Sequence, residues 1–322
     1  MRMPRLFCYS RATTMVSLAA QPIWRLPMAL WTRNSGGAAV SDIAQLRAHY
    51  VTLFARFGEP AADLEFTPGQ LGPIPGEWLR PPKSAPGRVI LYFHGGGYIA
   101  GSPESHRALI GRLAEASEAA AFAVRYRLAP ECVYPAPVRD GIDAYRGLLA
   151  SGVQPSGVVL AGDGSGGGLA FSVALAIRNA GLAMPAGIVA MSPWADLSLS
   201  GWSLLQNQKS DTAMHWEILF QCARHYLRKS NPSDAYASPC FANLKDFPPI
   251  MVHAGSAEIL RDDASKLGDR AADAATPVSV EIYDGMGHLF QADVRANEAK
   301  VSLARLGQFI RTKTSMLQAE IA

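Results

Sequence analysis

The stretch at residues 161–170, AGDGSGGGLA, has the composition of a nucleophile turn, but its serine stands one place later than that turn requires. In a G-x-S-x-G nucleophile elbow, the serine occupies a sharp strand-to-helix turn, with one glycine two residues before it and another two residues after it. In this chain that flanking belongs to Gly164, which lies between Gly162 and Gly166, whereas the serine is Ser165. The stretch therefore indicates acyl-transfer chemistry and leaves open which residue fills the nucleophile position.

Three further segments carry groups that acyl transfer needs. The glycines of HGGG, at residues 94–97, leave backbone N–H groups uncovered, and such groups stabilise a developing oxyanion. Glu258 offers a carboxylate, and His288, within DGMGHLF, offers an imidazole that can take up and release a proton. Each feature alone has an ordinary structural explanation: a glycine turn, an acid near a helix N-terminus, a structural histidine. The chain order of nucleophile turn, acid and histidine is the order found in α/β-hydrolases.

The elements that must position these groups are indicated by short apolar runs that alternate with helix-length segments. Continuous apolar strands separated by helices indicate a mostly parallel sheet with helices on both faces, an α/β fold. Each of the four segments comes directly after a predicted strand, and ligands bind at that edge of an open α/β sheet. The predicted strands are 89–93, 119–124, 158–161, 187–191, 250–253 and 278–282. The predicted helices are 106–117, 138–149, 168–179, 262–274 and 292–311.

Outside this pattern the chain adds three kinds of segment. Apolar residues at helical spacing predict a further helix over residues 41–57. The prolines between residues 73 and 86 predict connectors that contain no helix. Residues 199–231 lack a strand pattern and contain several aromatic side chains, so we expect a helical insertion over the sheet. The whole chain, residues 1–322, is expected to form one domain.

Composition excludes several classes of partner. The charge is nearly balanced, 30 basic against 27 acidic residues, and no basic run is present, so nucleic acid is not an expected ligand. No window reaches the ~18 uninterrupted apolar residues of a membrane span. No spacing typical of a metal or cofactor site is present, and the sequence leaves a homodimer open.

The expected location is the cytoplasm. Four well-separated cysteines, without a C-x-x-C pair, are typical of free thiols in a reducing compartment. Arginines ahead of the short apolar stretch at residues 15–20 leave a secretory leader as the alternative, but Pro22 and Pro27 interrupt the apolar character directly after that stretch.

Taken together, the motifs resemble the hormone-sensitive-lipase-like α/β-hydrolases, also called α/β-hydrolase fold-3, over roughly residues 89–309. Within that family the chain looks most similar to bacterial monoterpene ε-lactone hydrolases and carboxylesterases. The stretches that carry the resemblance are YFHGGGYIAGSPESHR, YRLAPE, VVLAGDGSGGGLA, SPWADLSLSG, ASPCFANL and YDGMGHLFQ.

The resemblance implies a role for each motif residue. Gly95, Gly96 and the backbone N–H of Ser165 look like the oxyanion hole, Glu258 like the acid and His288 like the base. It also implies a helical cap, formed here by about residues 1–58 and 199–231. The implied substrate is a small or medium ester or a lactone, and the family's reaction uses no cofactor or metal.

One departure from the family matters most. The family reads G-D-S-A-G-G or G-D-S-S-G-G at the elbow, and without a gap its serine falls on Gly164. Ser165 is the fallback nucleophile, but it would take the turn only if the register slipped by one residue. That slip would place Asp163 at a position that needs a small residue, and it would turn core side chains away from their partners, each worth ~1 kcal/mol or more.

We therefore interpret the chain as a serine-esterase scaffold with Gly164 in the nucleophile slot, an inactivated or very weak carboxylic-ester or lactone hydrolase. The alternative is a non-catalytic receptor for a small ligand on the same fold. Loss of the serine favours the receptor. Retention of both Glu258 and His288 disfavours it, because a binding module has no need for that pair.

Overall fold

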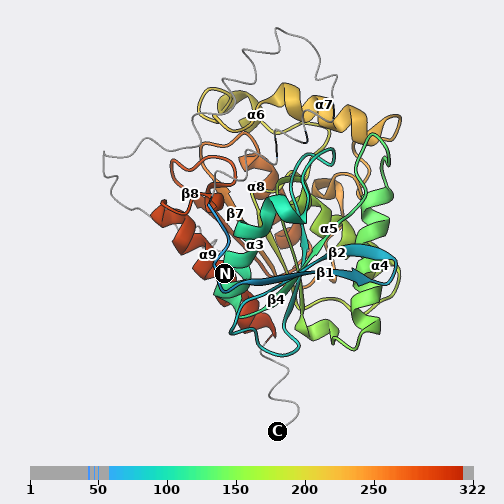
Figure 1. The fold of residues 1–322 in the computed structure, drawn as a ribbon. Coiled ribbons are helices and arrows are strands. Elements are labelled where there is room, and N and C mark those ends of the chain that lie inside the picture. Colours follow the sequence, from blue (N-terminus) through green and yellow to red (C-terminus); the bar gives the residue numbers. More distant parts are fainter. Residues whose placement is uncertain (1–42, 44–46, 48–49, 51–57, 315–322) are drawn as a thin grey trace, which may run out of the picture.

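The computed structural model describes residues 43, 47, 50 and 58–314 (Figure 1). Within these residues an eight-stranded sheet has the order β1-β2-β4-β3-β5-β6-β7-β8. The six strands from β3 to β8 are parallel to one another, and β2 is antiparallel to both of its neighbours, β1 and β4. The strands are β1 Glu65–Leu71, β2 Ile74–Arg80, β3 Val89–Phe93, β4 Ala120–Val124, β5 Val158–Asp163, β6 Gly187–Met191, β7 Ile250–Gly255 and β8 Val278–Tyr283. All six predicted strands are present, so the prediction of an α/β fold is confirmed.

Helices cover both faces of this sheet. One face packs against α4, α5 and α8, with Val138, Phe171 and Leu267 among the buried contacts. The opposite face packs against α3 and α9 through residues such as Ile110 and Leu306. These helices are α3 Pro103–Ser117, α4 Ala136–Ala150, α5 Gly164–Asn179, α8 Arg261–Asp273 and α9 Asn297–Thr314. Each contains most of a predicted helix, and α5 begins at Gly164, four residues before the predicted start.

The hairpin of β1 and β2 departs from the sequence prediction, which gives connectors for residues 73–86. Residues 65–80 form two antiparallel strands that pair from Glu65 with Arg80 to Leu71 with Ile74. The edge strand β1 is mostly exposed, so it has no apolar run to reveal it. Pro68 is tolerated there because an edge strand needs hydrogen bonds on one side only.

A helical insertion lies over the carboxyl edge of the sheet, at the top of Figure 1. It contains α6 Ser203–Gln206 and α7 Trp216–Leu227, as predicted for residues 199–231. The insertion packs directly on the loop after β3. There Tyr226 stacks on Tyr98 at 4.0 Å between ring centroids, and a Cβ built on Gly97 would lie 2.6 Å from Cys222 Sγ.

The predicted N-terminal helix at residues 41–57 lies outside the described residues, apart from Ile43, Arg47 and Tyr50, which are helical. Arg47 donates a hydrogen bond to the Ile99 carbonyl at 2.8 Å, which brings this residue to the glycine loop after β3. In the described part of the chain, no helix has the length and apolar content needed to cross a membrane.

Candidate active site

The tight turn between β5 and α5 is centred on Gly164. β5 ends at Asp163 and α5 begins at the next residue, so no loop separates them. Gly164 has a φ of +51°, in the left-handed region that favours glycine. A Cβ on Gly162 would lie 2.3 Å from the Gly166 carbonyl oxygen, and one on Gly166 would lie 2.0 Å from the Phe93 oxygen. The strand and the helix therefore require glycine at both flanks of residue 164, as the sequence argument expects for an elbow in the unshifted register.

Glu258 and His288 meet beside this turn. The Glu258 carboxylate is fully buried between β7 and α8. One of its oxygens accepts the backbone N–H of Gly255 at 3.0 Å, and the other lies 3.1 Å from His288 Nδ1. This contact places the Nδ1 proton toward the acid and leaves His288 Nε2 free to act as a base. The side chain of His288 is 10% exposed, so the pair is largely shielded from solvent while the imidazole remains accessible to a substrate.

The pKa values of the pair are shifted by burial and by their mutual charge. Burial lowers the pKa of His288. The hydrogen bond and charge of Glu258, with the charges of Asp211 and Asp163, outweigh burial and raise that pKa above the ordinary histidine value. Burial raises the pKa of Glu258, and the hydrogen bond to His288 opposes this rise. The pKa of Glu258 therefore stays above its ordinary value. The environment of His288 favours the imidazolium, the charge state that a general base reaches after it takes a proton.

His288 Nε2 faces residue 164 across a short gap. A Cβ built on Gly164 would lie 3.7 Å from His288 Nε2 and 3.9 Å from the Gly95 Cα. These are ordinary van der Waals distances, so a small side chain at position 164 would fit without displacing a neighbour. The structure thus brings four predicted site residues together: Gly95, Gly164, Glu258 and His288.

The glycine loop after β3 differs from its prediction in one respect. The Gly95 N–H donates to the Asp163 carboxylate at 3.0 Å, so it points into the fold rather than to a ligand. The same carboxylate accepts the Tyr92 hydroxyl at 2.8 Å and lies 3.4 Å from His106 Nε2. Gly95 therefore lines the site with its Cα, and its expected part in an oxyanion hole is not supported by this geometry.

The next two glycines keep their N–H groups available. Gly96 and Gly97 have φ values of +120° and +63°. In the described part of the chain, neither N–H donates a hydrogen bond to another group. The Gly96 carbonyl accepts from Ile99 and Ala100, which fixes the loop. The loop therefore presents two adjacent unpaired donors, of which Gly96 was predicted and Gly97 was not.

The Ser165 side chain has a different environment from the one that a nucleophile requires. Its hydroxyl is buried and makes no hydrogen bond of good geometry with any described residue. The hydroxyl lies near the Tyr126 phenol, where it partly offsets the rise that burial causes in the pKa of that phenol. Ser165 is the second residue of α5, and its backbone N–H is at the open end of the helix, where no intrahelical acceptor exists.

The sequence analysis gave no role in the site to three residues that the structure places there. Asp163 appears in the sequence only as a side chain too large for a shifted elbow, yet it fixes the glycine loop. Ser192, at the end of β6, accepts the Leu289 N–H at 2.9 Å and so holds the loop of His288. Asp211 comes from the insertion. A polar side chain within two residues of the end of a predicted strand is the signal that could have found Asp163 and Ser192.

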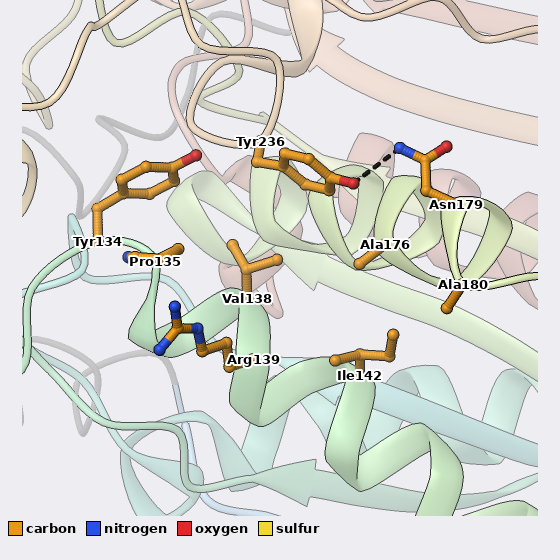
Figure 2. A pocket seen from close by; sticks show the side chains of 9 residues that line it. All are labelled: Tyr134, Pro135, Val138, Arg139, Ile142, Ala176, Asn179, Ala180 and Tyr236. Carbon is orange, nitrogen blue, oxygen red and sulfur yellow. Dashed lines mark hydrogen bonds between the residues drawn. The ribbon is translucent and has the colours of Figure 1, made fainter.

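A groove lies elsewhere, between α4 and α5 (Figure 2). Its volume is about 360 Å³. The Tyr236 hydroxyl accepts a hydrogen bond from Asn179 at its rim. Neither His288 nor residue 164 lines it, so it is separate from the candidate site. Its lining residues are Tyr134, Pro135, Val138, Arg139, Ile142, Ala176, Asn179, Ala180 and Tyr236. Over the described residues, no three His, Cys, Asp or Glu side chains are grouped to hold a metal ion.

The site combines an acid–histidine pair with a glycine-flanked strand-to-helix turn, and both lie at the carboxyl edge of a mostly parallel sheet. This combination defines the class of the scaffold as an α/β-hydrolase. A protein-family model described as alpha/beta hydrolase fold matches residues 90–292. An acetyl-hydrolase from Streptomyces hygroscopicus is 38% identical over 285 residues, which are 88% of this chain and 93% of that protein. An esterase from Acinetobacter venetianus is 36% identical over 248 residues, 76% of this chain and 82% of that protein.

Solved structures agree with these sequence relatives. An esterase from the bacterial hormone-sensitive lipase family superposes with a TM-score of 0.85 at 34% identity, covering 92% of this chain and all (100%) of that one. A structure of EstE5 soaked with p-nitrophenyl butyrate gives a TM-score of 0.82 at 34% identity, with coverage of 92% and 100%. The chain belongs to the α/β-hydrolase family, in its hormone-sensitive-lipase-like group, and by family it is a hydrolase.

Proposed function

We propose that this chain is a carboxylic-ester hydrolase of the serine-esterase type in which Gly164 occupies the nucleophile position. As it stands, it would be inactivated or would hydrolyse esters very slowly. The observation that carries the proposal is the 3.7 Å between His288 Nε2 and the Cβ position of residue 164. A serine hydroxyl at this position would be within reach of the base, and the base already contacts its acid.

With a serine at position 164, the residues would act by two-step acyl transfer. The hydroxyl attacks the ester carbonyl while His288 takes its proton and then gives it to the departing alcohol, which leaves an acyl-enzyme. Water, deprotonated by His288, then releases the acid and restores the serine, and Glu258 holds the imidazole in the tautomer that leaves Nε2 free. We propose the N–H groups of Gly96, Gly97 and Ser165 as the oxyanion donors, in place of Gly95. Without the serine, His288 can still activate a water. Enzymes stripped of a triad member keep roughly 10³-fold or more over the uncatalysed reaction.

The proposed substrate is a small-molecule ester with a short acyl chain, since relatives are named acetyl-hydrolase and esterase. A lactone, which is an internal ester, would use the same groups. We propose residues 199–231, together with the segment 1–58, as a cap over the site. The contacts of α7 with the glycine loop, at Gly97 and Tyr98, support the first part of that cap.

A non-catalytic receptor for a small ligand is the alternative on the same fold. The glycine at position 164 favours it, but the acid–histidine pair does not. The buried Glu258 carboxylate is held against His288 at 3.1 Å, and a receptor would gain nothing from such an acid–base pair.

The test is hydrolysis of p-nitrophenyl butyrate by the chain as it stands, beside Gly164→Ser and Ser165→Ala. Fast hydrolysis by Gly164→Ser alone would support the proposal. Fast hydrolysis by the unsubstituted chain that is abolished in Ser165→Ala would overturn it, because the nucleophile would then be Ser165.

A further inference from the structure

The segment of the insertion directly after α6, residues 207–211, is hydrogen-bonded to the loop that carries Glu258. We call this set of hydrogen bonds the clasp. Its hydrogen bonds reach four consecutive residues of that loop, 256–259. Asn207 Nδ2 donates to the carbonyls of Ser256 at 2.9 Å and Glu258 at 2.8 Å. The Ser210 hydroxyl donates to the Ala257 carbonyl at 3.0 Å. The insertion therefore contacts the backbone of the acid loop over its whole length.

Asp211 completes this clasp at the peptide unit that joins Glu258 to Ile259. The Asp211 carboxylate accepts the Ile259 N–H at 2.8 Å, while Asn207 donates to the carbonyl of the same peptide. Both polar groups of the peptide directly after the acid are thus held by the insertion. The other carboxylate oxygen of Asp211 accepts the N–H groups of Ala213 and Met214 at 3.0 Å. The clasp therefore fixes the direction in which Glu258 leaves the backbone.

The charge of Asp211 also bears on the histidine. Asp211 is 1% exposed and, among the described residues, forms no ion pair with a lysine or an arginine. Burial raises the pKa of Asp211, and the charge of His288, together with the backbone N–H groups of Ile259, Ala213 and Met214, opposes that rise. The acids that act on His288 are Glu258, Asp211 and Asp163, each from a different element. Asp211 is hydrogen-bonded to the peptide next to Glu258, and Glu258 contacts His288. A buried carboxylate so close to the proposed base is placed to stabilise that base when it is protonated.

We propose that Asp211 is a positioning residue for this site: it fixes the loop of Glu258 through the backbone and stabilises protonated His288 through space. This inference rests on the proposed function for its catalytic meaning, but its electrostatic part does not. The insertion then supplies more than a cover, because its buried carboxylate takes part in setting the basicity of the histidine.

The first arm of the test uses the chain as it stands. The titration of His288 is followed by NMR of histidine ring resonances, assigned with His288→Asn, in the parent, Asp211→Asn and Asp262→Asn. Asp262 is the matched control. It also accepts a backbone N–H from the insertion, that of Ser203 at 2.8 Å, but it is not among the charges that act on His288.

The expected result is a His288 midpoint that moves to lower pH in Asp211→Asn and stays in place in Asp262→Asn. Removal of a nearby negative charge disfavours the imidazolium, which gives the downward direction. An unmoved midpoint in Asp211→Asn, or an equal shift in both variants, would overturn the electrostatic part. If circular dichroism shows that Asp211→Asn is unfolded, Asp211→Ser, whose hydroxyl can still accept the Ile259 N–H, takes its place.

The second arm adds Asp211→Asn to Gly164→Ser. We expect kcat to fall by about tenfold to a hundredfold, the usual effect of a misplaced catalytic group, with KM unchanged within about twofold. A change confined to KM would contradict a positioning role. If Gly164→Ser itself is inactive, the proposed function fails, and the NMR arm still decides whether Asp211 acts on His288.

Discussion

Replacing Gly164 with serine is expected to restore esterase activity and to lower stability slightly. The stability cost comes from the backbone. Residue 164 has a φ of +51°, and the left-handed region costs a residue with a Cβ roughly 1–2 kcal/mol. No clash adds to this cost, because the nearest atoms to the new Cβ are 3.7 to 3.9 Å away.

The cost converts into a small change of Tm. An unfolding entropy of about 2.1 cal/mol/K per residue, over 322 residues, turns 1–2 kcal/mol into a loss of about 1.5 to 3 °C. The activity change is far larger. Loss of a triad nucleophile costs roughly 10⁴ to 10⁶ in kcat, so the serine should raise kcat for p-nitrophenyl butyrate by about that factor.

Gly164→Ala is the matched control, because it adds the same Cβ at the same φ and lacks the hydroxyl. Differential scanning calorimetry should give both variants the same fall in Tm, while the release of p-nitrophenol should rise in the serine variant alone. A serine variant no faster than the alanine variant would refute the assignment of the nucleophile position. A rise of Tm in either variant would refute the argument from backbone strain.

The geometry of the site gives three further expected outcomes. Ser165→Ala, introduced into Gly164→Ser, should leave kcat/KM within about twofold of the Gly164→Ser value. The substitution keeps the backbone N–H of residue 165 and removes only a hydroxyl that influences the pKa of Tyr126. In a pH–rate profile of Gly164→Ser, the acid limb of kcat/KM should have its midpoint above the ordinary histidine pKa of about 6.5. The base must be neutral to act, and Glu258 raises the pKa of His288. A midpoint below about 6.5 would contradict this prediction. Gly166→Ala should destabilise the fold by about 3 kcal/mol or more, measured by urea unfolding, because its Cβ would lie 2.0 Å from the Phe93 oxygen; unchanged stability would show that the elbow can relax.

The central strands were predictable because each is buried on both faces and therefore reads as an unbroken apolar run. All five residues of β3, for example, are buried. The hairpin of β1 and β2 was not predictable by this rule. β1 faces solvent over most of its length. Pro68 lies in β1 and Pro75 in β2, so the local composition of the hairpin resembles that of a loop.

The register of the elbow was predictable for a steric reason. Gly162 and Gly166 have no room for a Cβ, and a requirement of this kind leaves a fixed pattern of glycines around one position. The oxyanion donors were not predictable in the same way. Whether the Gly95 N–H is free depends on Asp163, which lies 68 residues away in the chain. The role of Asp211 was not predictable for the same reason, since its partner Ile259 is 48 residues away in the chain.

Retention of the acid–histidine pair favours an esterase scaffold over a receptor on energetic grounds. Burial of a carboxylate costs several kcal/mol, and a hydrogen-bonded partner returns that cost only when the geometry is good. Glu258 is fully buried, and its carboxylate is hydrogen-bonded to the Gly255 N–H and to His288. A pair of apolar side chains would hold β7 and the β8 loop together without this desolvation. The arrangement is favourable for a reaction that transiently protonates His288, because the charge that develops on the imidazole then lies beside a carboxylate that is already in place.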